Sequence, residues 1–205
     1  MRLYTAVRAP NPRRVEMFLA EKGIVDIQRV AVDLNAGEHK QAGFMARNPL
    51  ATVPVLELDD GRCLAESRAI CSYLETRYPE PNLMGESGEE RAFIEMADRQ
   101  IELQLFARIA NCIRHTHPGL APLEQPQFAE YGAAQGLKMR DSARWFDVQL
   151  ARHPFAAGDR FTIADITAFC AIEFARLMKF KPGDEGLPHL QAWRNRIAER
   201  PSASA

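Results

Sequence analysis

The sequence has few cysteines, almost no charge imbalance and no long apolar run. Its four cysteines, Cys63, Cys71, Cys112 and Cys170, are widely spaced and form no CxxC pair, so neither a zinc site nor an internal redox dithiol is indicated. The 26 lysines and arginines nearly cancel the 27 aspartates and glutamates, and both signs are scattered along the chain. This balance argues against a nucleic-acid partner.

The opening segment, MRLYTAVRAP, lacks the apolar stretch of a signal peptide, and no segment is apolar for long enough to span a bilayer. We therefore expect a cytoplasmic protein with no membrane partner. The content of 46% apolar and 26% charged residues is typical of a folded globular protein. A chain of 205 residues can bury a substantial core, and we expect two domains.

The first part of the chain alternates strand and helix patterns. Residues 3–7 and 27–32 predict strands, and apolar positions at helical spacing between them predict a helix that ends at Gly23. Asn11 followed by Pro12 is a favoured helix opening, because asparagine accepts from free backbone N–H groups and proline has none to leave unpaired. Asn11 is therefore the expected N-cap.

The next segments predict a short helix, a hairpin and a further helix. Residues 37–47 predict a short, polar, irregular helix, and alternating apolar residues on both sides of Asp60 and Gly61 predict two antiparallel strands. Ser67 then begins a helix that ends near Tyr78. The predicted order of elements is β-α-β-α-β-β-α.

Beyond a proline-rich linker, every periodic segment is helical. One long helix is predicted by apolar residues that recur every three or four positions, namely Ile94, Ala97, Ile101, Leu105, Ile109 and Ile113. Further helices are predicted over residues 139–150, 166–177 and 189–199. Thr162 and Asp165 have the spacing of a capping box, with Asp in place of the usual Glu.

These patterns place an α/β domain at residues 1–78, a linker at 79–87 and an all-α helical bundle at 88–205. Four segments of the sequence, RLYTAVRAPNPRRVEMFLAEKGI, NPLATVPVLELDDGRCLAES, YPEPNLMG and GDRFTIADI, resemble the soluble glutathione transferase superfamily over essentially the whole chain. The specific part is TVP followed by ES. The resemblance implies a thioredoxin-like glutathione-binding domain, a helical domain and a two-fold homodimer.

The segments APNPRRV and GEHKQAGFMARNP are most similar to a bacterial and fungal subgroup that lacks the usual tyrosine, serine or cysteine at the active-site turn. Asn11 occupies that place here. Because residues 9–12 contain no cysteine, the resemblance implies that the reacting thiol belongs to glutathione, bound as a co-substrate. No metal is expected.

The resemblance also assigns contacts to glutathione. Pro54 is implied to be cis, which leaves the backbone of Val53 free to pair with the cysteinyl part like an added strand. Ser67, at a helix start, is implied to bind the γ-glutamyl carboxylate, and Glu66 to bind the ammonium. The structural alternatives are a proline that only shapes its turn and an ordinary serine cap beside a solvated glutamate.

Lys40, with His39 as its neighbour, is implied to bind the glycine carboxylate of glutathione. The alternative for Lys40 is an exposed lysine on a polar helix.

The thiol of glutathione has to be ionised, since a thiol with a pKa near 8.5 is only about 3% thiolate at pH 7. Lowering this pKa to about 6.5 takes about 2.7 kcal/mol. A helix N-terminus supplies up to about 2 kcal/mol, and a hydrogen bond to a charged group about 1.5 to 3 kcal/mol. We expect the amino end of the helix that begins at Pro12 to stabilise the thiolate, the Asn11 amide to donate a hydrogen bond to the sulfur, and Arg14 to add positive field. The alternative is that Asn11 is only a helix cap.

Residues 114–117 follow the long helix and, by resemblance, line the electrophile side of the site. His115 is the candidate to orient a water or a proton there, because its charge state changes near neutral pH. The alternative is that His115, close to Pro118 and Gly119, caps its own helix.

Three functions compete. The first is a detoxifying glutathione transferase that conjugates glutathione to a small hydrophobic electrophile, whose pocket leaves no sequence motif. The second is glutathione-dependent disulfide or peroxide reduction, with two glutathiones in place of a CxxC. The third is a non-catalytic glutathione-binding module. The presence of Val53, Pro54, Glu66 and Ser67 favours real binding, and the transferase is our preferred reading.

Overall fold

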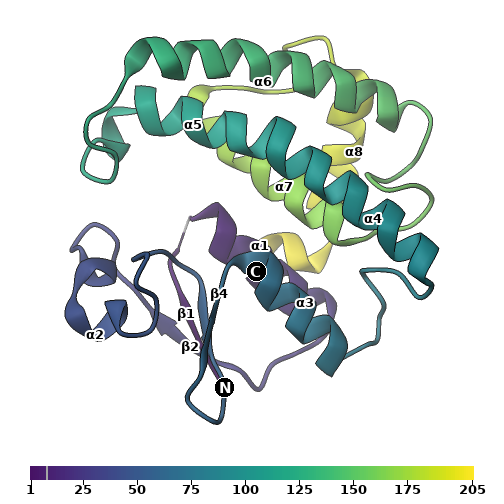
Figure 1. Ribbon diagram of the computed structural model, residues 1–205. Helices are drawn as coiled ribbons and strands as arrows, with labels where there is room; N and C mark the ends of the chain where they lie inside the picture. The colour runs from purple at the N-terminus through teal and green to yellow at the C-terminus, as the bar shows by residue number, and fades with distance from the viewer. Residues whose placement is uncertain (8) are drawn as a thin grey trace. The chain divides into compact units, whose positions relative to one another are not determined.

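The computed structural model describes residues 1–7 and 9–205 and divides into two compact units (Figure 1). The first unit comprises Met1–Asn82 together with Pro201–Ala205, and the second comprises Leu83–Arg200. The sequence patterns placed residues 201–205 with the helical domain. In the structure this segment belongs to the first unit, where Ser202 and Ala203 are buried.

The described part of the first unit is built on a four-stranded mixed sheet of order β2-β1-β3-β4. The elements are β1 (Arg2–Thr5), α1 (Pro10–Glu21), β2 (Gln28–Ala31), the 3-10 turn η1 (Glu38–Lys40), α2 (Ala42–Met45), β3 (Val55–Glu57), β4 (Cys63–Ala65), α3 (Ser67–Arg77) and the 3-10 turn η5 (Pro201–Ser204). Strand β1 is parallel to β2 and antiparallel to β3, which is antiparallel to β4. The predicted β-α-β-α-β-β-α order is confirmed.

The central strand β1 is buried on both of its faces, because successive strand residues point to opposite sides of a sheet. Leu3 belongs to the core that includes Phe18 of α1 and Leu74 of α3, all of them fully buried. Its neighbour Tyr4 belongs to a second cluster, with Phe44 of α2. The tyrosine and phenylalanine rings meet edge to face at 6.2 Å, so α2 is anchored despite its four residues.

Helix α1 begins earlier than its sequence pattern indicates. Its N-cap is Ala9, so the expectation that Asn11 caps this helix is wrong. Pro10 and Pro12 both fit the first turn, where a proline loses no hydrogen bond and its fixed φ already suits a helix. At the other end Gly23 has a φ of 66°, as suits a residue just after a helix, and the predicted end is confirmed.

The second unit is all-helical among its described residues, as predicted. Its elements are α4 (Gly88–Gln100), the π-helical segment η2 (Ile101–Phe106), α5 (Ala107–Thr116), η3 (Pro118–Leu120), α6 (Ala129–Leu150), α7 (Ile163–Ala175), η4 (Arg176–Met178) and α8 (Pro188–Ala198). None of the described helices is both long and apolar enough to cross a bilayer.

The predicted long helix is formed by α4, η2 and α5 in succession. Its apolar residues recur every four positions from Ala97 to Ile113, whereas an α-helix turns every 3.6 residues, so the stripe would drift around the axis. A wider π-helical turn absorbs this excess. As a result Ile101, Leu105 and Ile109 stay at most 1% exposed.

The predicted capping box at the start of α7 is confirmed. The Oδ2 atom of Asp165 accepts the N–H of Thr162 at 3.0 Å, and its Oδ1 atom accepts the N–H of Ala156 and the indole N–H of Trp193, each at 2.9 Å. One buried carboxyl group therefore joins the start of α7, the loop before it and α8.

Candidate functional site

The register of the sheet brings four connecting segments to one end of the first unit. Tyr4 pairs with Val55, and Val55 pairs with Ala65, while Thr5 pairs with Ala31 in the parallel direction. Because β3 runs opposite to the other strands, its start lies beside the ends of β1, β2 and β4. The segments that adjoin these strand ends contain all the expected glutathione contacts, namely Asn11, Arg14, His39, Lys40, Val53, Pro54, Glu66 and Ser67.

The amino end of α1 has few free backbone donors. Pro10 and Pro12 carry no N–H, and the N–H of Arg13 already bonds to the carbonyl of Ala9 at 3.1 Å. The N–H of Asn11 has no partner among the described residues, and the Asn11 side chain is exposed. Among the described residues, the donors that this helix end can offer to a ligand are therefore the backbone N–H and the side-chain amide of Asn11.

Arg14 is only 1% exposed, and its Nη1 donates to the Ser67 hydroxyl at 2.8 Å. Arg14 therefore bonds to α3, and its buried positive charge lies next to the first turn of α1. Ser67 is the first residue of α3, where backbone N–H groups have no partner within the helix. Because its hydroxyl oxygen accepts from Arg14, the hydroxyl hydrogen remains for a ligand.

Glu66 precedes α3 in an unusual backbone conformation, with φ 66° and ψ 113°. A non-glycine residue in this region costs about 1 to 3 kcal/mol, and such outliers gather at functional sites. The Glu66 side chain is exposed. This backbone conformation supports the prediction that Glu66 is a site residue, independently of the sequence motif.

The peptide bond between Val53 and Pro54 is cis, as the resemblance implies. Within the described residues, the backbone of Val53 makes no hydrogen bond. The preceding loop is held by Asn48, whose buried side-chain amide donates to the carbonyl and the hydroxyl of Thr52, each at 2.9 Å. Sequence reasoning missed Asn48, because Asn48-Pro49 indicated only the end of a helix.

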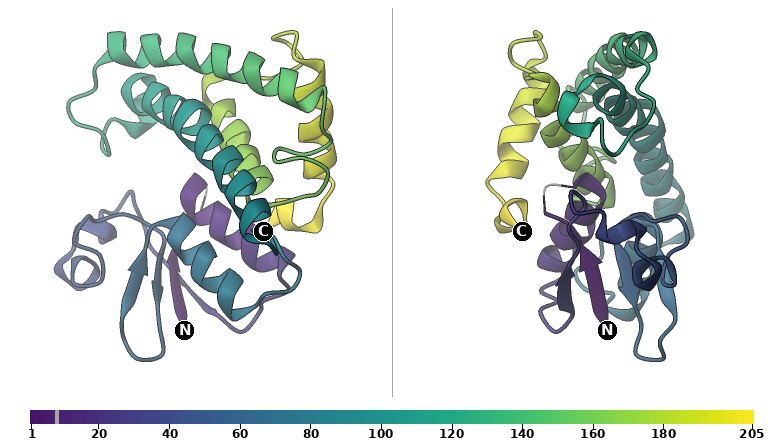
Figure 2. Two further views of the ribbon diagram at one scale, coloured as in Figure 1. Left: turned by 45° about the vertical axis from the view of Figure 1, so that its right-hand side comes forward. Right: turned by 90° about the vertical axis from the view of Figure 1, so that its left-hand side faces the viewer.

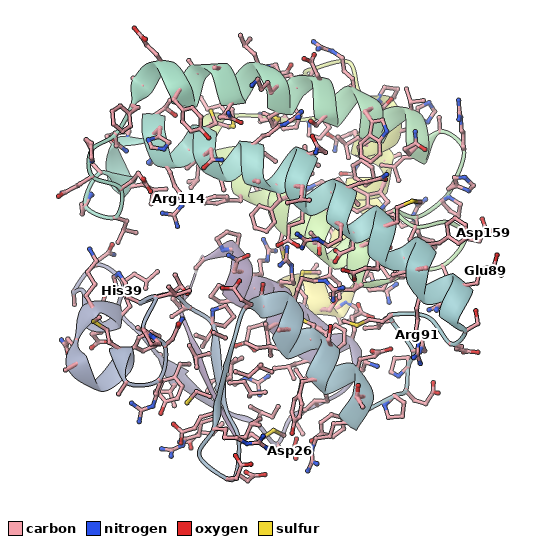
Figure 3. All side chains as sticks on the ribbon, in the orientation of Figure 1. Asp26, His39, Glu89, Arg91, Arg114 and Asp159 are labelled. Atoms are coloured by element: carbon pink, nitrogen blue, oxygen red, sulfur yellow. The ribbon has the colours of Figure 1, made fainter. Side chains whose placement is uncertain are left out.

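His39, which is labelled in Figure 3, lies in η1 together with Lys40, but the two side chains differ in burial. His39 is 6% exposed, and burial followed by the charge of Lys40 lowers its pKa. Its imidazole is therefore neutral near pH 7. Lys40 is exposed, so Lys40 is the cation that η1 can offer to a carboxylate.

His115 lies in the helical unit, near the end of α5. Its Nδ1 accepts the backbone N–H of Phe128 at 3.1 Å, and its ring packs edge to face on Tyr131 at 5.1 Å. The C-cap residue of α5 is His117, and the His115 ring bonds to Phe128 instead, so His115 is not the C-cap of its own helix. His115 instead braces the start of α6, which leaves Nε2 as the nitrogen available for chemistry; Glu124 lies 3.9 Å from it.

A mixed sheet with a cis-proline before β3, followed by a helical unit, is an architecture that this chain shares with glutathione transferases. The model of the glutathione S-transferase N-terminal domain matches residues 9–77, and that of the C-terminal domain matches residues 115–201. The chain belongs to the glutathione S-transferase family of enzymes, and the fold expected from the sequence is confirmed.

Particular relatives match nearly the whole chain. Glutathione S-transferase 2 of Saccharomyces cerevisiae is 38% identical over 98% of this chain and 87% of its own length. The crystal structure of Gtt2 from the same yeast has a TM-score of 0.94, covering 100% of this chain and 99% of that one. A glutathione S-transferase domain-containing protein of Marinobacter aquaeolei VT8 is 43% identical, with a TM-score of 0.93 and coverage of 98% and 99%.

Proposed function

We propose that the protein binds glutathione at the end of its first unit, stabilises the glutathione thiolate and conjugates it to a small hydrophobic electrophile. The observation that carries this proposal is the convergence, at one end of the sheet, of the exposed Asn11 on α1, the start of α3 at the buried Ser67, and a Val53 backbone that makes no hydrogen bond to the described residues. Glutathione has a thiol between two carboxylates. Asn11 can bind the thiol, Ser67 the γ-glutamyl carboxylate and Lys40 the glycine carboxylate.

The binding mode follows from the groups that are free. The backbone of Val53 pairs with the cysteinyl part of glutathione, as an added strand would. Ser67 donates its N–H and hydroxyl to the γ-glutamyl carboxylate, because the start of α3 favours an anion, and Glu66 binds the ammonium. Lys40 binds the glycine carboxylate, with neutral His39 buried beside it.

Activation of the thiol depends chiefly on Asn11 in this proposal. Two prolines in the first turn leave α1 with fewer free N–H groups than most helices, and the attraction of a helix end for an anion comes from such groups. A hydrogen bond from the Asn11 amide to the sulfur adds about 1.5 to 3 kcal/mol. The buried charge of Arg14 acts in the same direction.

The reaction is nucleophilic substitution or addition. With an aryl halide, the thiolate sulfur forms a bond to the ring carbon, and the halide leaves with the electron pair of the broken bond. The alternative is disulfide or peroxide reduction by two glutathiones. We propose that the enzyme works as a cytoplasmic homodimer in detoxification, as is typical of the family.

The first experiment measures glutathione binding by calorimetry and the bound thiolate by its ultraviolet absorbance, and then compares rates on an aryl halide and on a small mixed disulfide. We expect glutathione to bind, its thiol pKa to fall, and the aryl halide to be the better substrate. A faster reaction with the disulfide would make the protein a reductase. No detectable binding would leave a non-catalytic module.

For His115, we propose that Nε2 orients a water or a proton on the electrophile side. His115→Asn keeps an acceptor where Nδ1 receives the N–H of Phe128 but removes Nε2. We expect this variant to melt within a few degrees of the wild type and to lose about tenfold or more in kcat. His115→Ala removes both groups and should also lower the melting temperature. If His115→Asn keeps the wild-type kcat, His115 has only the structural role of supporting the start of α6.

A further inference from the structure

Residues near the end of the chain pack along the helix that carries Asn11. The 3-10 turn η5 lies beside α1 in both views of Figure 2 and contacts it directly. The Ser202 hydroxyl donates to Glu21, and the carbonyl of Ala203 accepts from the Nη2 atom of Arg13 at 2.8 Å. Ser202 is 3% exposed and Ala203 is 9% exposed, so both residues of the turn are buried against the first unit.

The two hydrogen bonds lie near opposite ends of α1. Arg13 and Glu21 are separated by eight residues, which is about 12 Å along an α-helix. The turn therefore holds α1 over most of its length. Its contact with Arg13 falls in the first turn of the helix, two residues after Asn11.

The amino end of that first turn is poorly capped. No side chain caps it within the described part of the chain, and Pro10 and Pro12 contribute no N–H. Within the described residues, the first backbone bond made by an N–H of this helix joins Arg13 to the carbonyl of Ala9. A first turn without a side-chain cap depends on tertiary contacts to stay in place, and these include the bond from Arg13 to Ala203 and the bond from Arg14 to Ser67.

We propose that η5 is a positioning element of the active site, which acts through the bond between Arg13 and Ala203. By holding the first turn of α1, this bond keeps the Asn11 amide at the place where the glutathione sulfur binds. The inference rests on the proposed function. It assigns Arg13 a positioning role that requires no contact with glutathione.

Two variants remove the contact in different ways. A chain ending at Arg200 lacks η5, and Arg13→Met keeps η5 but removes the donor. Arg29→Met is the matched control, because it is the same substitution and also removes a contact that involves α1, namely the ion pair of Arg29 with Glu16. That contact lies in the middle of the helix.

Hydrogen exchange at residues 13 and 14 tests the brace without any ligand. We expect faster exchange at these two amides in the truncated chain and in Arg13→Met, and unchanged exchange there in Arg29→Met. With glutathione, the first two proteins should show the thiol pKa moved toward that of free glutathione and a Kd raised about three- to tenfold, the effect of one ordinary hydrogen bond.

Unchanged exchange at residues 13 and 14 in Arg13→Met would overturn the inference, even if the truncated chain fails to fold. Faster exchange with an unchanged thiol pKa would also overturn it, since η5 would then support the fold alone. Failure of the wild-type protein to bind glutathione is a separate result, which overturns the proposed function and with it the active-site role.

Discussion

Replacing Asn11 with alanine is expected to raise the thiol pKa of bound glutathione and to lower kcat/KM about 10- to 150-fold. This range corresponds to about 1.5 to 3 kcal/mol, the contribution of one hydrogen bond to a charged group. The loss is large because Asn11 supplies both donors that the amino end of α1 offers, and the alanine variant keeps only the backbone N–H.

The same substitution should leave the melting temperature almost unchanged. Ala9, not Asn11, is the N-cap of α1, and the Asn11 side chain is exposed, so its removal costs the helix no cap. Thiolate absorbance against pH measures the first effect, and thermal melting measures the second. Asn11→Asp serves as a control, because it keeps the shape of the side chain but places a negative charge beside the sulfur. Normal affinity and an unshifted thiol pKa in Asn11→Ala would remove Asn11 from the mechanism.

Replacing Asp165 with alanine is expected to lower the free energy of unfolding by about 3 to 5 kcal/mol. The carboxyl group accepts from the N–H groups of Ala156 and Thr162, from the Thr162 hydroxyl and from the indole of Trp193. Alanine leaves these buried donors without an acceptor, and each unsatisfied group costs about 1 to 3 kcal/mol, not additively. Thermal or denaturant unfolding measures the loss.

Asp165 also gives stability a pH dependence. Burial raises its pKa from 3.8 to about 6, so the folded protein holds this proton more tightly than the unfolded chain. The stabilisation from the protonated group is therefore complete below pH 3.8 and is lost as the pH rises toward about 6. The asparagine of Asp165→Asn cannot ionise. We therefore expect the free energy of unfolding of the wild type, measured relative to that of this variant, to fall from pH 4 to pH 7. A constant difference over that range would contradict the raised pKa.

The features that the sequence predictions missed share one cause. Asn11 followed by Pro12 matches a helix opening, but Pro10 matches one as well, and only the folded structure, in which Ala9 is the N-cap, decides between them. The sequence indicates that Arg14 adds positive field near the sulfur, but only the fold shows that its guanidinium bonds to Ser67, 53 residues away in sequence. His115 was weighed as a cap and instead accepts from Phe128, at the start of the next long helix.

The sequence by itself determined the order of strands and helices, the capping box at Thr162 and the identities of the candidate contacts to glutathione. These features depend on neighbours within a few residues, through alternation, helical periodicity and turn chemistry. Only the tertiary structure decided that the four segments meet at one end of the sheet, because strand register joins residues that no local pattern relates. It likewise decided that the carbonyl of Ala203 accepts a hydrogen bond from Arg13, 190 residues earlier, because no sequence pattern predicts the partner of a backbone carbonyl outside regular secondary structure.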